Sequence, residues 1–497
     1  MLELLMLDEV GQTKLKIYAH FSTLQSSILN LATLCETLEC SYARLQSLLD
    51  EIDQDMEKMN STSLRDVEGK FEITEHIFDY NAYQQYLIRD GIPYRFLLTS
   101  LIDPEITLQD FFEQNFTSRS SMARKLRPLA DYLATLGIKL NRSQLKLQGE
   151  EQTLRLVYFN FIWFGSYGED VFAHISIADK LQRDDRWVAY IAPVNPQEWR
   201  LRLTIGLLRQ QQGHFIRHFD FEGLTLPQLK DPYETLMADY YVSPQQKKDE
   251  LTYLAYLAFY WPNYYLKDDP RLDYVETTLV MNPLGLTQLI REMIKDITGR
   301  LVFSPIDQDT RRLLEANLFI AFYNQRFSSY RLPMISAFMR EQMENKTSLY
   351  PVLHHYVSDY LHKRIQETSY DWLEDKLDDL TFLCTFILLP QFELSKRQKK
   401  LTVGIIAIPN FLLLHELQDF LENLNYTESL VLASADQKDC DFYIATSTYL
   451  LKDVPPEKAY IISFSGKSDY IQELFQLLKT AHVELNISAT KEEFLPA

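Results

Sequence analysis

A cluster of basic side chains between residues 117 and 155 could bind the phosphates of a nucleic acid. The basic residues of this segment are Arg119, Arg124, Lys125, Arg127, Lys139, Arg142, Lys146 and Arg155. Against three acidic residues they give the segment a net charge of +5, within a 497-residue chain whose formal net charge is −19. A local basic patch on an acidic protein indicates a surface for an anionic partner, and double-stranded DNA is the first candidate.

The elements around this cluster predict a helix-turn-helix. We expect a helix over Thr107–Gln114, a turn at Asn115–Thr117, and a second helix that Ser118 caps and that runs to Leu136. At about 100° per residue, its apolar stripe consists of Met122, Leu126, Leu129, Leu133 and Leu136. Nearly opposite lie Ser120, Arg124, Arg127 and Asp131. Pro128 should kink this helix near the end of its basic part.

A β-hairpin is expected directly after the second helix, over Gly137–Gly149. In it Ile138 and Leu140 face Leu145 and Leu147, while Lys139 and Lys146 lie on the opposite side. Arg142 stands at the tip, in a four-residue turn over Asn141–Gln144. Three helices with a basic wing form a winged helix, which favours DNA binding. The candidate contacts are Ser118, Arg119, Ser120, Arg124, Lys125, Arg127, Lys139, Arg142 and Lys146.

The N-terminal residues predict another winged helix with a weaker DNA signal. Helices are expected over Thr13–Ser22, near 31–38, and from the cap Ser41 to about Met59, followed by a hairpin over Val67–Ile73. The third of these helices has a net charge of −3. Only Arg44, at its N-terminal end, could approach phosphates without repulsion, so we expect an auxiliary role.

The remainder of the chain predicts a mainly α, multidomain protein. Residues 166–396 are helical in pattern, and proline-rich breaks divide them into two blocks near Met281–Gly285. After residue 400, short apolar strands alternate with helices, which indicates a small α/β domain with a mainly parallel sheet. Glycine is scarce, at 14 residues, and this also favours helices.

No motif for an enzyme, a metal or a cofactor emerges, and we expect none of the three. Gly466–Ser468 resembles the end of a Walker A motif, but Ile461 stands where its first glycine is required. The four cysteines form no C-x-x-C pair and suit a reducing compartment. The N-terminus lacks the basic start of a signal peptide, and no apolar run is long enough for a span. We therefore expect a cytoplasmic protein without a membrane partner.

The second helix and the hairpin resemble the second DNA-binding helix and wing of the Mga/AtxA family. The resemblance lies in Ser118–Leu133, Gly137–Leu140 and Leu147–Glu150. These proteins are virulence gene regulators of low-GC Gram-positive bacteria. The resemblance implies five domains along the chain. They are winged helices at 1–75 and 76–165, helical phosphotransferase-system (PTS) regulation domains at 166–290 and 291–396, and a domain like the EIIB transport component at 397–497.

The resemblance also implies a phosphorylation site. Leu208–Phe215 is similar to the segment of the first regulation domain whose histidine accepts phosphate from the phosphocarrier protein, and His214 falls on it. Residues 253–260, 318–327 and 380–389 contain no histidine, so regulation by several phosphates is not expected. Val403–Asn410 lacks the cysteine that a transport EIIB phosphorylates. The C-terminal domain should then promote a homodimer or higher homo-oligomer.

Two other functions remain open. A protein with PTS-regulation domains could be an RNA-binding antiterminator, but such proteins begin with a small β-rich RNA-binding module instead of helix-turn-helix units. A phosphoryl-transfer component would need a nucleophile in the C-terminal domain, where Cys440 lies away from the expected position.

Overall fold

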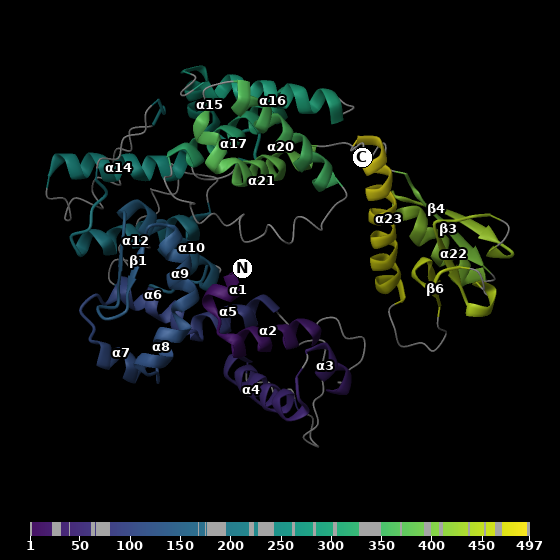
Figure 1. The fold of residues 1–497 in the computed structure, drawn as a ribbon, viewed down its shortest axis with the longest axis horizontal. Helices are drawn as coiled ribbons and strands as arrows, with labels where there is room; N and C mark the ends of the chain where they lie inside the picture. The colour runs from purple at the N-terminus through teal and green to yellow at the C-terminus, as the bar shows by residue number, and fades with distance from the viewer. Residues whose placement is uncertain are drawn as a thin grey trace. The chain divides into compact units, whose positions relative to one another are not determined.

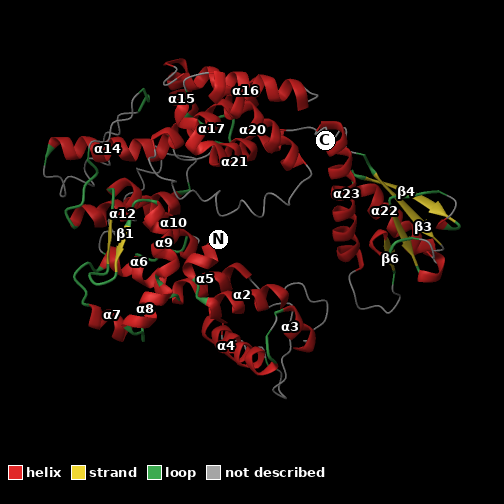
Figure 2. Cartoon of the chain, in the orientation of Figure 1, coloured by secondary structure: helices red, strands yellow, loops and turns green. Residues whose placement is uncertain are grey.

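The computed structural model is mainly helical and forms two compact units (Figures 1 and 2). It describes residues 2–21, 31–38, 40–60, 65, 80–166, 168–173, 175, 195–217, 223–226, 243–260, 264–281, 285–301, 306–327, 349–367, 370–391, 399–406, 411–435, 438–451, 454–462 and 470–494. The first unit comprises Met1–Leu284 and Tyr323–Phe338, and the second comprises Gly285–Phe322 and Met339–Ala497. The finer division into five domains stays a prediction.

Four helices form the N-terminal part of the first unit. They are α1 (Leu2–Met6), α2 (Glu9–Phe21), α3 (Leu31–Thr37) and α4 (Tyr42–Asn60). Ser41 caps α4 as expected, since its Oγ accepts a 3.3 Å hydrogen bond from the Arg44 N–H. The hairpin expected over Val67–Ile73 lies outside the described residues.

The acidic side chains of α4 are largely used inside the unit. Lys14 Nζ lies 2.9 Å from Asp55 Oδ2 and 3.1 Å from Glu51. The Tyr83 hydroxyl donates to Asp55 at 3.0 Å. Because Asp55 is buried with these partners, the net charge of −3 counted along α4 overstates the acidity of its exposed face.

The next part of the unit contains the expected helix-turn-helix. Its helices are α5 (Tyr80–Asp90), α6 (Ile92–Ile102), α7 (Leu108–Gln114), α8 (Arg119–Lys125), α9 (Arg127–Thr135) and α10 (Glu151–Ser166). Thr107 Oγ1 and Ser118 Oγ cap α7 and α8 by accepting hydrogen bonds from backbone N–H groups at 3.2 and 3.3 Å. The predicted apolar stripe from Met122 to Leu136 is buried.

The single helix expected from Ser118 to Leu136 is wrong: it is two helices, with a break at Leu126. Pro128 has no N–H to donate to the carbonyl of Arg124, and its ring restricts the preceding turn. Pro128 instead occupies the start of α9, a position that proline favours. Arg127, which follows the break, therefore belongs to a different helix from Arg119 and Arg124.

The wing pairs β1 (Lys139–Asn141) with antiparallel β2 (Lys146–Gln148). Leu140 lies opposite Leu147, which places both lysines on the other face, as expected. The connection runs from Arg142 to Leu145, one residue later than predicted. Asn141 accounts for this shift, because its Oδ1 accepts hydrogen bonds from the N–H groups of Ser143 and Gln144 and so closes the turn from its first residue.

The helices that follow are α12 (Pro196–Gln211), α14 (Pro244–Phe259) and α15 (Leu272–Met281) in the first unit. α16 (Leu286–Leu301), α20 (Leu349–Glu367) and α21 (Leu377–Leu388) belong to the second, and α17 (Gln308–Phe327) has residues in both. Short 3₁₀ turns flank α21 at Asp371–Lys376 and Leu389–Gln391. No described helix combines the length and apolar character needed to cross a membrane.

The C-terminal residues form the expected α/β sheet. Its strands are β3 (Leu401–Ile406), β4 (Thr427–Leu432), β5 (Phe442–Ala445) and β6 (Ala459–Ile461), in the order β4-β3-β5-β6, all parallel. Helices α22 (Phe411–Asn423) and α23 (Tyr470–Phe494) contribute Leu417, Leu421, Leu474 and Leu478 to its core. Gly466–Ser468 lies outside the described residues.

Candidate nucleic-acid interface

One face of α8 and its cap presents polar and basic side chains to solvent. Ser118, Arg119, Ser120 and Arg124 are all exposed. Arg127, at the start of α9, is also exposed and forms a loose 3.8 Å ion pair with Asp131. The buried stripe holds the opposite face of both helices, so these guanidinium groups are available to a partner in solution.

The wing adds two cations next to α8. Lys139 and Arg142 line a cavity of about 550 Å³ together with Arg119, Met122 and Leu108. Three positive side chains from two elements thus surround one hollow. This is the arrangement that a winged helix needs in order to place a helix and a wing along the same nucleic-acid backbone.

Two basic residues of the cluster have internal partners. Lys125 Nζ lies 2.9 Å from Asp8 Oδ2 on the N-terminal segment. Partial burial of Asp8 opposes its ionisation, but the Gly11 N–H and Lys125 outweigh burial and lower the pKa of Asp8. Arg155 is buried and paired with carboxylates, so it adds no positive charge to the exposed surface. The positive surface is therefore smaller than the sequence count suggested.

Lys146 does not line the hollow beside α8. Its Nζ is 3.9 Å from Glu105 Oε1. It lines a second cavity, of about 400 Å³, which Arg209, Gln212 and His214 also line. Lys146 therefore borders a cavity that the end of α12 also borders, and it is not part of the surface around the hollow beside α8.

Arg44, the candidate contact of the N-terminal helices, is exposed in the first turn of α4. The hairpin expected after α4, over Val67–Ile73, lies outside the described residues. A role for Arg44 in binding stays a prediction.

Residues 77–162 match the Mga helix-turn-helix domain. The chain carries a Mga helix-turn-helix domain. The match includes α7, α8, α9 and the wing, and it ends within α10. It indicates a DNA-binding transcription regulator, in agreement with the exposed basic residues of α8. No curated protein matches the chain.

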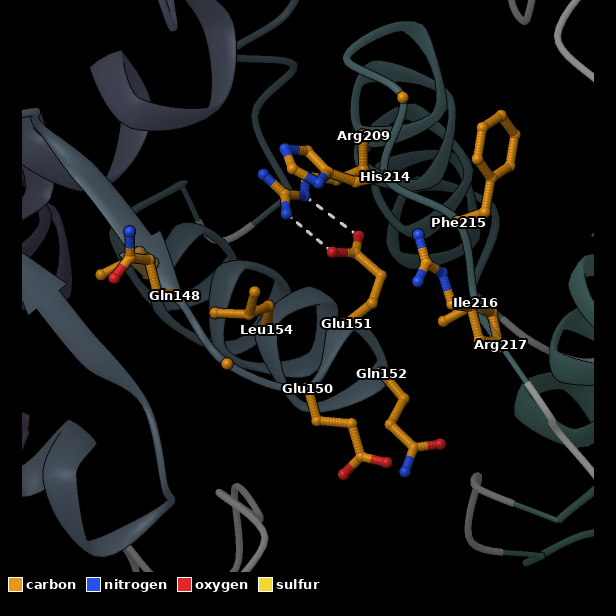
Figure 3. A pocket seen from close by; sticks show the side chains of 13 residues that line it. Gln148, Glu150, Glu151, Gln152, Leu154, Arg209, His214, Phe215, Ile216 and Arg217 are labelled. Atoms are coloured by element: carbon orange, nitrogen blue, oxygen red, sulfur yellow. Dashed lines mark hydrogen bonds and ion pairs between the residues drawn. The ribbon is translucent and has the colours of Figure 1, made fainter.

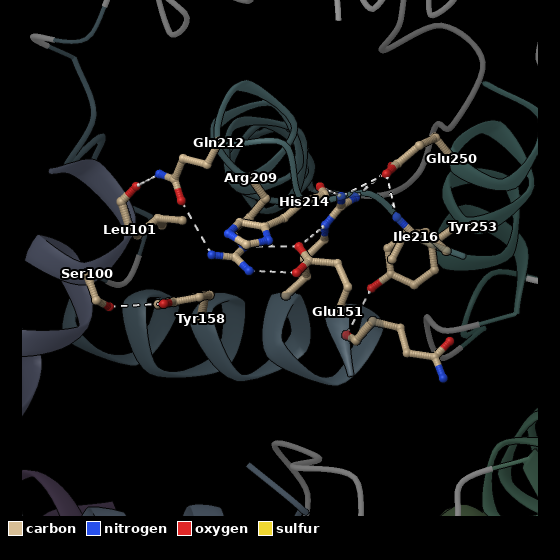
Figure 4. Close-up of polar contacts among 12 residues, drawn as sticks. Ser100, Leu101, Glu151, Tyr158, Arg209, Gln212, His214, Ile216, Glu250 and Tyr253 are labelled. Carbon is tan, nitrogen blue, oxygen red and sulfur yellow. Dashed lines mark hydrogen bonds and ion pairs between the residues drawn. The ribbon is translucent and has the colours of Figure 1, made fainter. Parts of the chain in front are cut away.

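His214 follows the C-terminal end of α12, behind the wing of the Mga domain. α12 ends at Gln211, so His214 lies beyond the helix. Gly213 takes a positive φ of 79° and the His214 N–H donates to the Arg209 carbonyl at 2.9 Å. This is a Schellman motif, in which the second residue beyond the cap packs back on the helix. The motif places the exposed imidazole beside the Arg209 guanidinium (Figure 4).

Buried ion pairs join this segment to α10 of the Mga domain. Arg209 contacts both carboxylate oxygens of Glu151, at 3.0 and 2.6 Å. Arg155 donates to Glu151 at 3.0 Å and to both oxygens of Glu250 at 2.7 and 2.8 Å. Glu250 lies on α14, so three helices share one alternating network of charges.

The same network binds the backbone around His214. Arg155 Nη2 donates to the His214 carbonyl at 3.2 Å, and Glu250 Oε1 accepts from the Ile216 N–H at 2.9 Å. Sequence reasoning missed this arrangement. It counted Arg155 as a surface charge and gave no role to Glu250, since residues 95 positions apart show no local pattern.

The surroundings of Glu151 and Arg155 favour their charged forms, whereas those of His214 favour the neutral imidazole. Burial opposes ionisation of Glu151, but hydrogen bonds from Arg209 and the charge of Arg155 outweigh it and lower the Glu151 pKa. Burial alone would likewise lower the pKa of Arg155, which Glu250 and Glu151 raise above its usual value. At His214, partial burial and then Arg209 lower the imidazole pKa.

His214 also borders a cavity of about 480 Å³ (Figure 3). Its walls come from the end of the wing and the start of α10, including Gln148 and Glu150, and from Gly213–Arg217. A molecule or protein side chain that reaches His214 would therefore also meet the connection between the wing and α10.

Proposed function

We propose that the protein is a transcription regulator of the Mga type that binds double-stranded DNA mainly through α8, the start of α9 and the wing. The observation that carries the proposal is a basic surface on a Mga helix-turn-helix domain, made of the exposed side chains of Arg119, Arg124, Arg127 and Lys139 and the half-buried side chain of Arg142. Exposed guanidinium groups beside a wing suit contacts to DNA phosphates. The resemblance to virulence regulators extends the proposal to control of genes of that kind.

A binding experiment across a salt series tests this function. Labelled duplex DNA is titrated with the full chain from about 50 to 200 mM salt, with single-stranded RNA as competitor. Duplex binding that weakens with salt and resists the RNA supports the proposal. Preference for the RNA would support the antiterminator alternative instead, and failure to bind either nucleic acid would exclude both functions.

We further propose that His214 accepts phosphate from the phosphocarrier protein of the sugar phosphotransferase system. A lowered pKa keeps the imidazole neutral, which is the nucleophilic form that phosphoryl transfer requires. A phosphate adds a charge of about −1.5 to −2. Beside the Glu151–Arg209 pair, that charge would repel Glu151 and attract Arg209. Because Arg155 holds both Glu151 and the His214 carbonyl, the change would reach α10.

Two substitutions of His214 should therefore have opposite effects on promoter activity. His214→Asp introduces negative charge beside Arg209, whereas His214→Ala removes the acceptor. A reporter assay measures their activity, and phosphate transfer from purified phosphocarrier protein and its kinase is measured on the wild type. His415→Ala, which changes an exposed histidine paired with Asp419, should leave phosphate transfer unchanged. If both His214 variants behave alike, or the wild type accepts no phosphate, His214 has only a structural role.

We propose that the C-terminal sheet domain promotes a homodimer. Residues 401–497 contain 14 acidic and 6 basic residues, a net charge of −8 that opposes self-association. The domain nevertheless exposes large apolar side chains at Phe411 and Leu412 on α22, and at Val431 on the edge strand β4. An interface between copies must then rest on such apolar surface.

Sedimentation should show a dimer that persists or strengthens as salt screens the acidic charge. Phe411→Glu should shift the full chain toward monomer by placing a like charge at the interface. Tyr265→Glu, at an exposed aromatic residue of the first unit, is the matched control and should not. A dimer unaffected by Phe411→Glu and by removal of residues 401–497 would place the interface elsewhere in the chain.

The phosphoryl-transfer alternative has little support from Cys440. Its side chain is buried against Tyr443 and near Gly404. Burial raises the pKa of its thiol, and a raised pKa disfavours the thiolate that accepts a phosphoryl group.

A further inference from the structure

The turn between α7 and α8 holds an exposed aromatic side chain beside the proposed DNA surface. Phe116 is 97% exposed and has a φ of 46°. The Thr117 N–H donates to the Phe112 carbonyl at 3.1 Å and the Phe116 N–H to the Glu113 carbonyl at 3.4 Å. These two bonds define a Schellman motif, and Phe116 occupies the position after the helix cap, where glycine is usual.

The same motif ends two other helices of the first unit, and both use glycine. Gly137 follows α9 with a φ of 70°, and Gly213 follows α12 with a φ of 79°. Their bonding patterns match that of Phe116, with the next residue donating to Leu133 and to Arg209. A side chain at positive φ places Cβ close to the backbone, which costs free energy. The turn before α8 thus retains a strained phenylalanine in a position that glycine would fill without strain.

Packing within the unit does not account for Phe116. Leu145, the other described non-glycine residue with a positive φ, is only 2% exposed and fills the core of the wing. Burial compensates for its backbone conformation. Phe116 has no such compensation in the described structure. Strain together with an exposed apolar ring indicates that Phe116 makes a contact outside the chain.

Hydrogen bonds of Asn115 fix the turn that carries the Phe116 ring. Asn115 Nδ2 donates to the Phe111 carbonyl at 2.8 Å, and Asn115 Oδ1 accepts from Arg95 at 3.2 Å. Phe111 itself is fully buried. Phe116 lies just before Ser118, the cap of α8, and in helix-turn-helix proteins the start of this helix contacts base edges in the major groove.

We propose that Phe116 contacts thymine methyl groups in the major groove and so gives the protein a preference for A·T pairs. The proposal rests on the DNA-binding function above. Thymine methyls are the apolar feature of the major groove, and phenylalanine is among the side chains that contact them. An uncharged ring neutralises no phosphate. The contribution of Phe116 to the binding free energy should therefore not change with salt concentration.

Replacing thymine by deoxyuridine removes only the methyl group and tests the contact. The full chain is titrated with an A·T-rich duplex of about 30 base pairs, close to three helical turns, and with the same duplex containing deoxyuridine. The wild type should bind the deoxyuridine duplex about fourfold more weakly for each methyl contacted, which corresponds to ~0.8 kcal/mol per buried carbon. Phe116→Ala should bind the two duplexes equally, with an unchanged salt slope.

Phe116→Gly separates a lost contact from a damaged fold. Glycine relieves the positive φ, so this variant should melt at or above the wild-type temperature while also losing the thymine preference. Tyr265→Ala, at an aromatic residue that is 69% exposed on the same unit, should keep the preference.

Equal wild-type binding to the two duplexes, or a preference retained in Phe116→Ala, overturns the thymine contact but leaves salt-dependent DNA binding intact. Absence of binding to either duplex overturns the proposed function itself, and the contact with it.

Discussion

Replacing Glu250 by alanine should lower the free energy of unfolding of the first unit by about 3–5 kcal/mol, because it leaves a buried cation without its partner. Glu250 is fully buried and contacts Arg155 through both oxygens, at 2.7 and 2.8 Å. The substitution also removes the acceptor of the Ile216 N–H. Of its two carboxylate partners, Arg155 would retain Glu151, which is already shared with Arg209.

Urea unfolding of the full chain measures this loss, with hydrogen exchange of α10 and α14 assigning the transition to the first unit. The matched control is Glu169→Ala, which removes an exposed carboxylate paired with Arg89 and should change stability by less than about 1 kcal/mol. Replacing both partners, as Arg155→Met with Glu250→Met, should recover much of the lost stability because no charge is left buried alone. A loss for Glu250→Ala no larger than that of the control would show that water or another group solvates Arg155.

The consequences of this pair reach beyond stability. Arg155 lies within the Mga domain, whereas Glu250 and His214 lie on later elements of the same unit. Glu250→Ala should therefore expose the ends of α10 and α14 to exchange together. The buried pair couples the DNA-binding domain to the segment around His214, and that coupling is a requirement of the proposed switch.

Local signals in the sequence were enough to predict most of the helix-turn-helix. Ser41 and Ser118 act as caps because a short hydroxyl side chain can accept from the first turn of a helix. The stripe from Met122 to Leu136 is buried because its spacing matches one helical face. The break at Leu126 exceeded the predicted kink, since Pro128 removes a bond and also favours the start of a new helix.

Pairing across long stretches of sequence was not predictable in this way. Lys125 has the spacing of a surface residue, yet it contacts Asp8 more than a hundred residues earlier. Arg155 was counted with the DNA-binding cluster, yet it is buried among carboxylates from α10 and α14. Charge along a segment does not show which charges face solvent; that depends on which elements pack together. The positive φ of Phe116 was also missed. Glycine after a helix predicts a left-handed residue from the sequence, but phenylalanine in the same position gives no such signal.

Removing Arg119, Arg124 and Arg127 together should remove the larger part of the salt dependence of duplex binding, leaving the contribution of Lys139 and Arg142 on the wing. All three are exposed on α8 and the start of α9. Each lost phosphate contact should reduce the slope of log affinity against log salt by about 0.9, so the triple alanine variant should lose about 2.7. Since phosphate contacts carry no sequence information, affinity should fall similarly for unrelated duplexes.

Lys125→Ala provides the matched control for the arginine variants, because it removes a positive charge from the same helix. Its ammonium is already neutralised by Asp8 at 2.9 Å, so the salt slope should change by much less than about 0.9. Binding is measured by fluorescence anisotropy from about 50 to 200 mM salt, and circular dichroism verifies that every variant is folded. If the triple variant keeps the wild-type slope while Arg44→Ala loses it, DNA binds to α4 of the N-terminal helices and not to α8 of the Mga domain.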